Sequence, residues 1–123
     1  MSIARTVAIL GASADPDRYA FMARMLLQQQ GYRVIPVNPK LGSIDGDATV
    51  ASLHDIHEPV DTLTVYVRSQ VSSENRAAIE ALKPRRVIFN PGAENPALAA
   101  LLSAAGIETE DACTLVLLRT RQF

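Results

Sequence analysis

The sequence predicts a three-layer, doubly wound α/β fold, in which helices cover both faces of a parallel sheet of about five strands. Short runs rich in Val and Ile alternate along the chain with segments of helical spacing, and turn-forming residues stand between them. Such alternation implies right-handed crossovers between parallel strands. The 123 residues suffice for one hydrophobic core, so we expect a single domain over residues 1–123.

The apolar runs are the predicted strands. They lack the polar alternation of half-exposed strands, which is typical of strands buried on both faces. Four of them are Thr6–Leu10, Arg33–Val37, Thr62–Val67 and Arg86–Phe89, and residues 107–110 are expected to form the fifth.

Three segments have apolar residues at positions i, i+3, i+4 and i+7, so each is predicted to be a helix with one face on the sheet. They run from Tyr19 to Leu26, from Asn75 to Leu82 and from Leu98 to Ala105. Helix-terminating residues follow all three, and Asn95-Pro96 supplies an N-cap and a first-turn proline for the last.

Two segments are less regular. The pattern of residues 112–118 fits either a short helix or an edge strand, because periodicity over so few residues does not decide between them. The Pro- and Gly-containing stretch from Asn38 to Gly46 is expected to be a surface excursion within the domain.

Composition limits the partners and the location. The chain has 12 Lys and Arg against 13 Asp and Glu, so we expect no nucleic-acid binding. No apolar run approaches about 18 residues, and Met1–Arg5 lacks the start of a signal peptide, so we expect no membrane association. The single cysteine, Cys113, cannot form an internal disulfide, and a cytoplasmic location is expected.

A ligand is expected where loops leave the C-terminal ends of the strands. In the first loop, residues 11–18, Gly11 allows a tight turn and the following helix offers its N-terminal amides to a phosphate. Ala12 follows Gly11, Ser13 adds a hydroxyl and Arg18 a guanidinium.

This first loop differs from the usual dinucleotide fingerprint. A Gly-x-Gly-x-x-Gly match from Gly11 would need glycines where Ser13 and Pro16 stand. The carboxylate expected near the end of the second strand is also missing, because Asn38-Pro39-Lys40 stands there. A cation at that place favours a ligand with an additional phosphate near its ribose, either coenzyme A or NADP.

Two further loops lie on the same side of the predicted sheet. Val67-Arg68 lies at the end of the third strand, and Arg68 either reaches a diphosphate or pairs with Asp61 or Glu94. Asn90 and Gly92 follow the fourth strand, where Gly92 permits close backbone approach to a ligand.

Two motifs together suggest a family. Gly11-Ala12-Ser13 with Pro16 and Arg18, followed by the stretch Gly-Tyr-Arg-Val-Ile-Pro-Val-Asn-Pro at 31–39, resembles the small stand-alone coenzyme A-binding proteins related to the N-terminal domain of the succinyl-CoA synthetase alpha subunit. The resemblance spans nearly the whole chain. It implies a Rossmann-like fold and coenzyme A contacts at Gly11, Ser13, Asn38, Lys40 and Arg68.

This chain departs from that family at the fourth loop and offers no group that carries over the synthetase chemistry. Many relatives have Trp-x-Gln-x-Gly there, whereas this sequence has Phe89-Asn90-Pro91-Gly92. The synthetase's phosphorylated histidine lies in a further domain, so an acyl-CoA ligase activity would require partner chains.

The first hypothesis is therefore a non-catalytic binding or regulatory module for coenzyme A or an acyl-CoA. The alternatives are an NADP-binding oxidoreductase or redox sensor, and a protein-interaction scaffold with a vestigial crevice. A homodimer through the apolar C-terminal tail and an unidentified protein partner are further expectations. The expected binding residues are Gly11, Ala12, Ser13, Arg18, Asn38, Pro39, Lys40, Val67, Arg68, Asn90 and Gly92.

Four other residues have a simpler interpretation than a functional one. We expect Cys113 to be buried rather than a reactive thiol. His54 and His57 are expected at the surface, because no further metal ligand of fitting spacing accompanies them. Glu94 is expected to stabilise the following helix through its dipole rather than to act as a general base.

Overall fold

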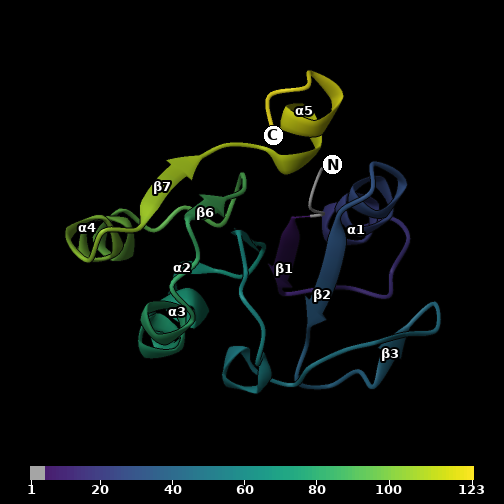
Figure 1. Cartoon of the computed structure of the whole chain (residues 1–123), viewed down its shortest axis with the longest axis horizontal. Helices are drawn as coiled ribbons and strands as arrows, with labels where there is room; N and C mark the ends of the chain where they lie inside the picture. Colours follow the sequence, from purple (N-terminus) through teal and green to yellow (C-terminus); the bar gives the residue numbers. More distant parts are fainter. Residues whose placement is uncertain (1–4) are drawn as a thin grey trace.

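The computed structural model describes residues 5–123, and within them five parallel strands form one sheet in the order β2-β1-β5-β6-β7 (Figure 1). The bounds are β1 Thr6–Leu10, β2 Arg33–Val37, β5 Thr62–Val65, β6 Arg86–Phe89 and β7 Glu108–Asp111. The predicted doubly wound, Rossmann-like fold is confirmed. Two strands differ from the prediction: β7 lies one residue later, and β5 ends at Val65, so that Tyr66 and Val67 belong to the loop.

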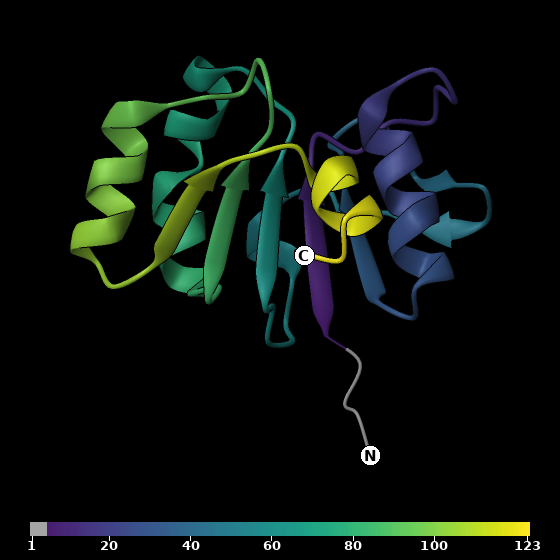
Figure 2. The same cartoon turned by 90° about the horizontal axis from the view of Figure 1, so that it is seen from above.

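The helices form one layer on each face of the sheet (Figures 1 and 2). One layer consists of α1 (Tyr19–Gln29) and α5 (Thr114–Arg119). The other contains α2 (Ser69–Glu74), α3 (Arg76–Leu82), α4 (Pro96–Ala104) and the short 3-10 helix η1 (Leu53–Asp55).

Strand β1 shows why the apolar runs are unbroken. Val7 and Ile9 pack toward α1 and α5, whereas Ala8 and Leu10 pack toward α3 and α4. All four side chains are at most 6% exposed. Both faces of a central strand are therefore core, and no polar residue is needed between the apolar ones.

The predicted helix boundaries and sheet-facing residues are confirmed in part. Pro96 is the first residue of α4, and the Asn95 side chain accepts a hydrogen bond from Leu98 N at 3.1 Å. The helix expected from Asn75 begins at Arg76 as α3, and it is preceded by α2, which was not predicted. Tyr19 was predicted to face the sheet and is instead 62% exposed, because the first turn of α1 borders the cleft described below.

The C-terminal segment forms the helix α5, which decides between the two alternatives. Leu115 and Leu118 are buried within the chain's own core, and Val116 is 52% exposed. Cys113, at the N-cap of α5, is half-buried and not buried as predicted.

The surface excursion after β2 contains a hairpin that was not predicted. Its strands are β3 (Ser43–Ile44) and β4 (Asp47–Ala48), joined by Asp45 and Gly46, both with positive φ. An Asp-Gly pair of this conformation is the preferred two-residue hairpin turn. Ile44 is buried in the core beside α1, so the hairpin packs on that helix.

Candidate functional site

A cleft of about 500 Å³ opens at the C-terminal ends of β1 and β5. The loop after β1 leads to α1 on one face of the sheet, and the loop after β5 leads to α2 on the other. The two loops therefore diverge at this point, which is where open α/β sheets bind ligands. The lining residues are Gly11, Ser13, Asp17, Arg18, Tyr19, Ala20 and Tyr66.

Gly11 is at the closest approach of the two loops. Its φ is +88°, and a Cβ at this position would lie 2.7 Å from Cγ1 of Val67. The tight turn predicted at Gly11 is confirmed, and the structure adds a packing reason for glycine. Val67 is half-buried against this turn and does not line the cleft.

The backbone amides at the start of the first loop differ from those at the start of the following helix. Those of Gly11 and Ala12 donate to the carbonyl of Val37, at 3.2 and 3.1 Å, and so fasten the loop to the end of β2. Within the described residues, no side chain caps the first turn of α1. Its first two residues, Tyr19 and Ala20, line the cleft, so the positive end of the helix dipole faces the cavity.

Polar side chains of this loop line the cleft, among them the half-buried Ser13 and the exposed Arg18. Ser13 Oγ accepts a hydrogen bond from Asp15 N at 3.0 Å, which shapes the loop. Arg18 Nε lies 3.8 Å from an Asp15 carboxylate oxygen, a loose pair between largely exposed side chains. The guanidinium of Arg18 is therefore weakly held and borders the cleft.

Asn38 joins the turn after β2 to the first loop. Its Nδ2 donates to the carbonyl of Ala12 at 2.8 Å, and its Oδ1 accepts from Lys40 N at 2.7 Å. Pro39 and Lys40 are exposed, and Lys40 forms no ion pair in the described part of the chain. The structure thus brings the Asn38-Pro39-Lys40 turn beside the first loop, with the lysine ammonium free.

Arg68 is also exposed and unpaired among residues 5–123. Neither of its two expected partners binds it. Asp61 pairs with Arg85 at 3.0 Å, and Glu94 Oε1 accepts a hydrogen bond from Gly92 N at 2.8 Å.

Asn90 lies inside the protein, 2% exposed and outside the lining of the cleft. Its Nδ2 donates to Thr64 Oγ1 at 2.7 Å and to the carbonyl of Val65 at 2.9 Å. Its Oδ1 accepts from Thr114 N at 2.8 Å. The side chain therefore connects β5, β6 and α5.

Tyr66 is a cleft residue that sequence reasoning missed, because the apolar run placed it inside the strand. Burial raises the pKa of its hydroxyl to about 12, and the hydroxyls of Thr114 and Thr64 oppose this shift only in part. The hydroxyl is therefore neutral at physiological pH, and it lies close to those of Thr64 and Thr114. Its position directly after the strand beside β1 was the signal available in the sequence.

The remaining expectations concern metals and membranes. His54 and His57 are exposed, as predicted, and residues 5–123 contain no group of three or more His, Cys, Asp or Glu suited to a metal ion. None of the helices in the same range is long and apolar enough to cross a membrane. The predicted absence of a signal peptide rests mainly on residues 1–4, which lie outside the described residues.

Comparison with solved structures finds the same fold over most of this chain. A crystal structure of an uncharacterized protein aligns with a TM-score of 0.92 and 39% identity, covering 99% of this chain and 100% of that one. The structure of cell-free ID.343 from Thermus thermophilus aligns with a TM-score of 0.87 and 39% identity, covering 98% of this chain and 91% of that one. A dinucleotide-forming acetyl-coenzyme A synthetase from Ca. Korarchaeum cryptofilum aligns over 85% of this chain and 25% of its own, with a TM-score of 0.74; at 17% identity this shows the fold alone.

Sequence comparison gives a relative and a family. The uncharacterized protein YneT of Bacillus subtilis (strain 168) is 38% identical over 66 residues, which are 54% of this chain and about half, 49%, of that protein. The model of the CoA binding domain matches residues 5–119. With nearly all of its length matched, the chain belongs to the CoA binding domain family.

Proposed function

We propose that this protein binds coenzyme A or an acyl-CoA in the cleft at the ends of β1 and β5, as a non-catalytic binding or regulatory module of one domain. The observation that carries the proposal is the uncapped first turn of α1, which opens into the cleft of a CoA binding domain. Free amides at a helix N-terminus, with the helix dipole behind them, are a binding site for phosphate groups.

We assign the diphosphate of the ligand to the part of the cleft at the first turn of α1. Tyr19 and Ala20 would offer backbone amides, Ser13 its hydroxyl and Arg18 its guanidinium. Arg18 suits the role because its guanidinium is only loosely paired in the free protein. Arg68, exposed at the start of α2, would approach the ligand from the other side.

The 3′-phosphate of coenzyme A is assigned to Lys40. This lysine is exposed and unpaired within the described chain, and Asn38 holds its backbone next to the first loop. Lysine binds phosphate as a flexible point charge, so it needs a positioned backbone more than a fixed side chain.

The test is calorimetric titration of ligand-stripped protein with coenzyme A, dephospho-coenzyme A, NADP and NAD in one buffer. Saturable binding of coenzyme A in preference to both nicotinamide dinucleotides is expected. Stronger binding of NADP would contradict the proposal and favour an NADP-binding oxidoreductase or redox sensor. Absence of binding by all four ligands would favour a protein-interaction scaffold.

Lys40→Glu should weaken coenzyme A by about 10- to 100-fold, the worth of one hydrogen bond between charged groups, and should change dephospho-coenzyme A little. Lys83→Asp is the control. Lys83 ends α3 with a φ of +51°, which aspartate tolerates. It lies just before β6 begins at Arg86, so the substitution makes the same charge change at the N-terminal end of the sheet. Equal losses for both ligands in Lys40→Glu would refute the assignment of the 3′-phosphate.

A further inference from the structure

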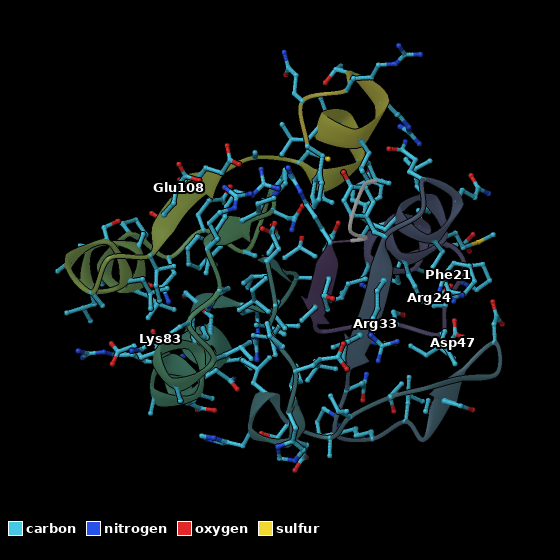
Figure 3. The ribbon with its side chains drawn as sticks, viewed as in Figure 1. Phe21, Arg24, Arg33, Asp47, Lys83 and Glu108 are labelled. Carbon is cyan, nitrogen blue, oxygen red and sulfur yellow. The ribbon has the colours of Figure 1, made fainter. Side chains whose placement is uncertain are left out.

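Arg24 is a buried cation outside the cleft. It lies on α1 with its side chain 4% exposed, and it points toward the hairpin of β3 and β4 (Figure 3). Its Nη2 lies 2.9 Å from Asp45 Oδ2 and its Nη1 lies 2.8 Å from Asp47 Oδ2. The guanidinium also stacks 5.0 Å from the ring centre of Phe21. We call Arg24, Asp45 and Asp47 the Arg24 clamp.

The hairpin needs this clamp to keep its place. Each of its strands has only two residues, and so short a ribbon is not stable on its own. Gln28 supports the clamp by donating to Asp47 Oδ2 at 2.8 Å, and Ile44, 1% exposed, is the apolar anchor beside it. The position of the hairpin on α1 therefore depends on the apolar contacts of Ile44 and Leu41 and on one ion-pair network.

The hairpin belongs to the same segment as Lys40. This segment leaves β2 at Asn38 and returns at Val50, where Asn38 N donates to Val50 O at 2.9 Å and Val50 N donates to Pro36 O at 3.0 Å. Lys40 thus lies between two anchors. Asn38 holds its backbone beside the first loop, whose residues line the cleft, and the hairpin holds the following residues on α1.

We propose that Arg24 is a positioning residue for ligand binding: by holding the hairpin on α1 it fixes the backbone around Lys40 and sets the preference for coenzyme A over dephospho-coenzyme A. This inference rests on the proposed function, because it requires the contact between Lys40 and the 3′-phosphate. Arginine suits the task because its planar fork spans two carboxylates, which the single ammonium of a lysine does not.

Two variants release the clamp in different ways. Arg24→Met fills the buried site with an apolar chain of similar length and leaves only the exposed carboxylates unpaired, so the fold should persist. Asp45→Asn with Asp47→Asn keeps the core intact, and asparagine tolerates the φ of +48° at position 45. Arg76→Met, which breaks a surface pair on α3, is the matched control.

The variants are compared with the wild type by two measurements, amide hydrogen exchange and the ratio of the two dissociation constants. In either clamp variant the amides of Lys40 and Thr49 should exchange at least about tenfold faster, because local opening becomes easier. The preference for coenzyme A should fall at least about fivefold, while dephospho-coenzyme A binding changes less than about twofold. Arg24→Lys should give intermediate values, and Arg76→Met should match the wild type.

Three results would overturn the inference. Unchanged exchange would show that the clamp does not hold the segment. Faster exchange with an unchanged preference would show that the clamp is structural only. A wild-type protein that does not distinguish the two ligands would refute the role of Lys40 first, and the inference with it, so the two failures are separable.

Discussion

At Gly11 the backbone conformation and the surrounding space both exclude a side chain. A φ of +88° costs an L-residue about 1–2 kcal/mol, since it brings Cβ against the following carbonyl. The close Val67 methyl adds a steric cost that positive φ alone does not. The residue thereby determines how near the loops after β1 and β5 come to each other.

Gly11→Ala should lower the free energy of unfolding by about 2–5 kcal/mol, the conformational cost plus about 1–3 kcal/mol of overpacking. Gly31→Ala is the control, because Gly31 has a φ of +89° and no atom within 4 Å of its added Cβ. It should lose only about 1–2 kcal/mol. Urea denaturation of both variants measures the difference. Equal losses in the free energy of unfolding would show that the Val67 side chain moves aside without a steric cost.

At the scale of elements, Asn90 joins three of them. A buried amide with all its partners inside the protein stabilises the contact between β5, β6 and α5. α5 has six residues, too few to form a stable helix without tertiary contacts, so its position depends on such bonds and on Leu115 and Leu118.

Asn90→Ala should destabilise the protein by about 2–4 kcal/mol, because it leaves buried hydrogen-bonding groups without partners. Asn75→Ala removes the same side chain where it makes one local bond, to the carbonyl of Val71 at 2.8 Å, and should cost about 1 kcal/mol. Urea denaturation compares the two, and amide exchange in α5 should accelerate only in Asn90→Ala. Similar losses would contradict the role of Asn90 as a connection between elements.

These elements also show what the sequence could and could not predict. Strands buried on both faces are recognisable as unbroken apolar runs, and helices packed on a sheet have apolar residues at the helical period. The order of these elements and most of their bounds therefore followed from the sequence. The hairpin has two-residue strands and no period, and α5 is too short to distinguish from a strand. Asn90 follows a strand like the other crevice residues, but its side chain turns inward to bind β5 and the start of α5, contacts that exist only in the folded structure.

Across the whole molecule, charge is used differently at the two ends of the sheet. At the N-terminal ends of the strands arginines are paired with carboxylates: Arg85 with Asp61 and Glu108, and Arg33 with Glu58. At the C-terminal ends Lys40 and Arg68 have no ion-pair partner in the described residues. One end therefore contributes stability, and the other keeps cations available for an anionic ligand.

The ion pair of Arg85 and Asp61 makes the free energy of unfolding depend on pH in the acid range. The hydrogen bond from Arg85 lowers the pKa of Asp61 below its ordinary value of 3.8, despite partial burial. A carboxylate with a lowered pKa contributes stability above its unfolded value, and this is lost as pH falls through the folded value. The free energy of unfolding should therefore decline below about pH 4.

Arg85→Gln should remove part of this acid-dependent decline, by less than about 1 kcal/mol because the pair is screened by solvent. Arg119→Gln removes the same charge from an exposed residue of α5 and should keep the wild-type slope. Urea denaturation at several pH values between about 2 and 6 measures the slopes. Identical slopes for wild type and Arg85→Gln would contradict the coupling.

The edge strand β7 has a consequence for solubility. Its sequence, Glu-Thr-Glu-Asp, places three carboxylates on a strand whose outer backbone groups have no neighbouring strand among residues 5–123. Glu108 and Glu110 pair with Arg85 and Arg86, and Asp111 has no ion-pair partner in the same range. Two such edges approaching each other would bring like charges together, which opposes strand pairing between molecules. The acidic side chains thereby protect the open side of the sheet against edge-to-edge aggregation.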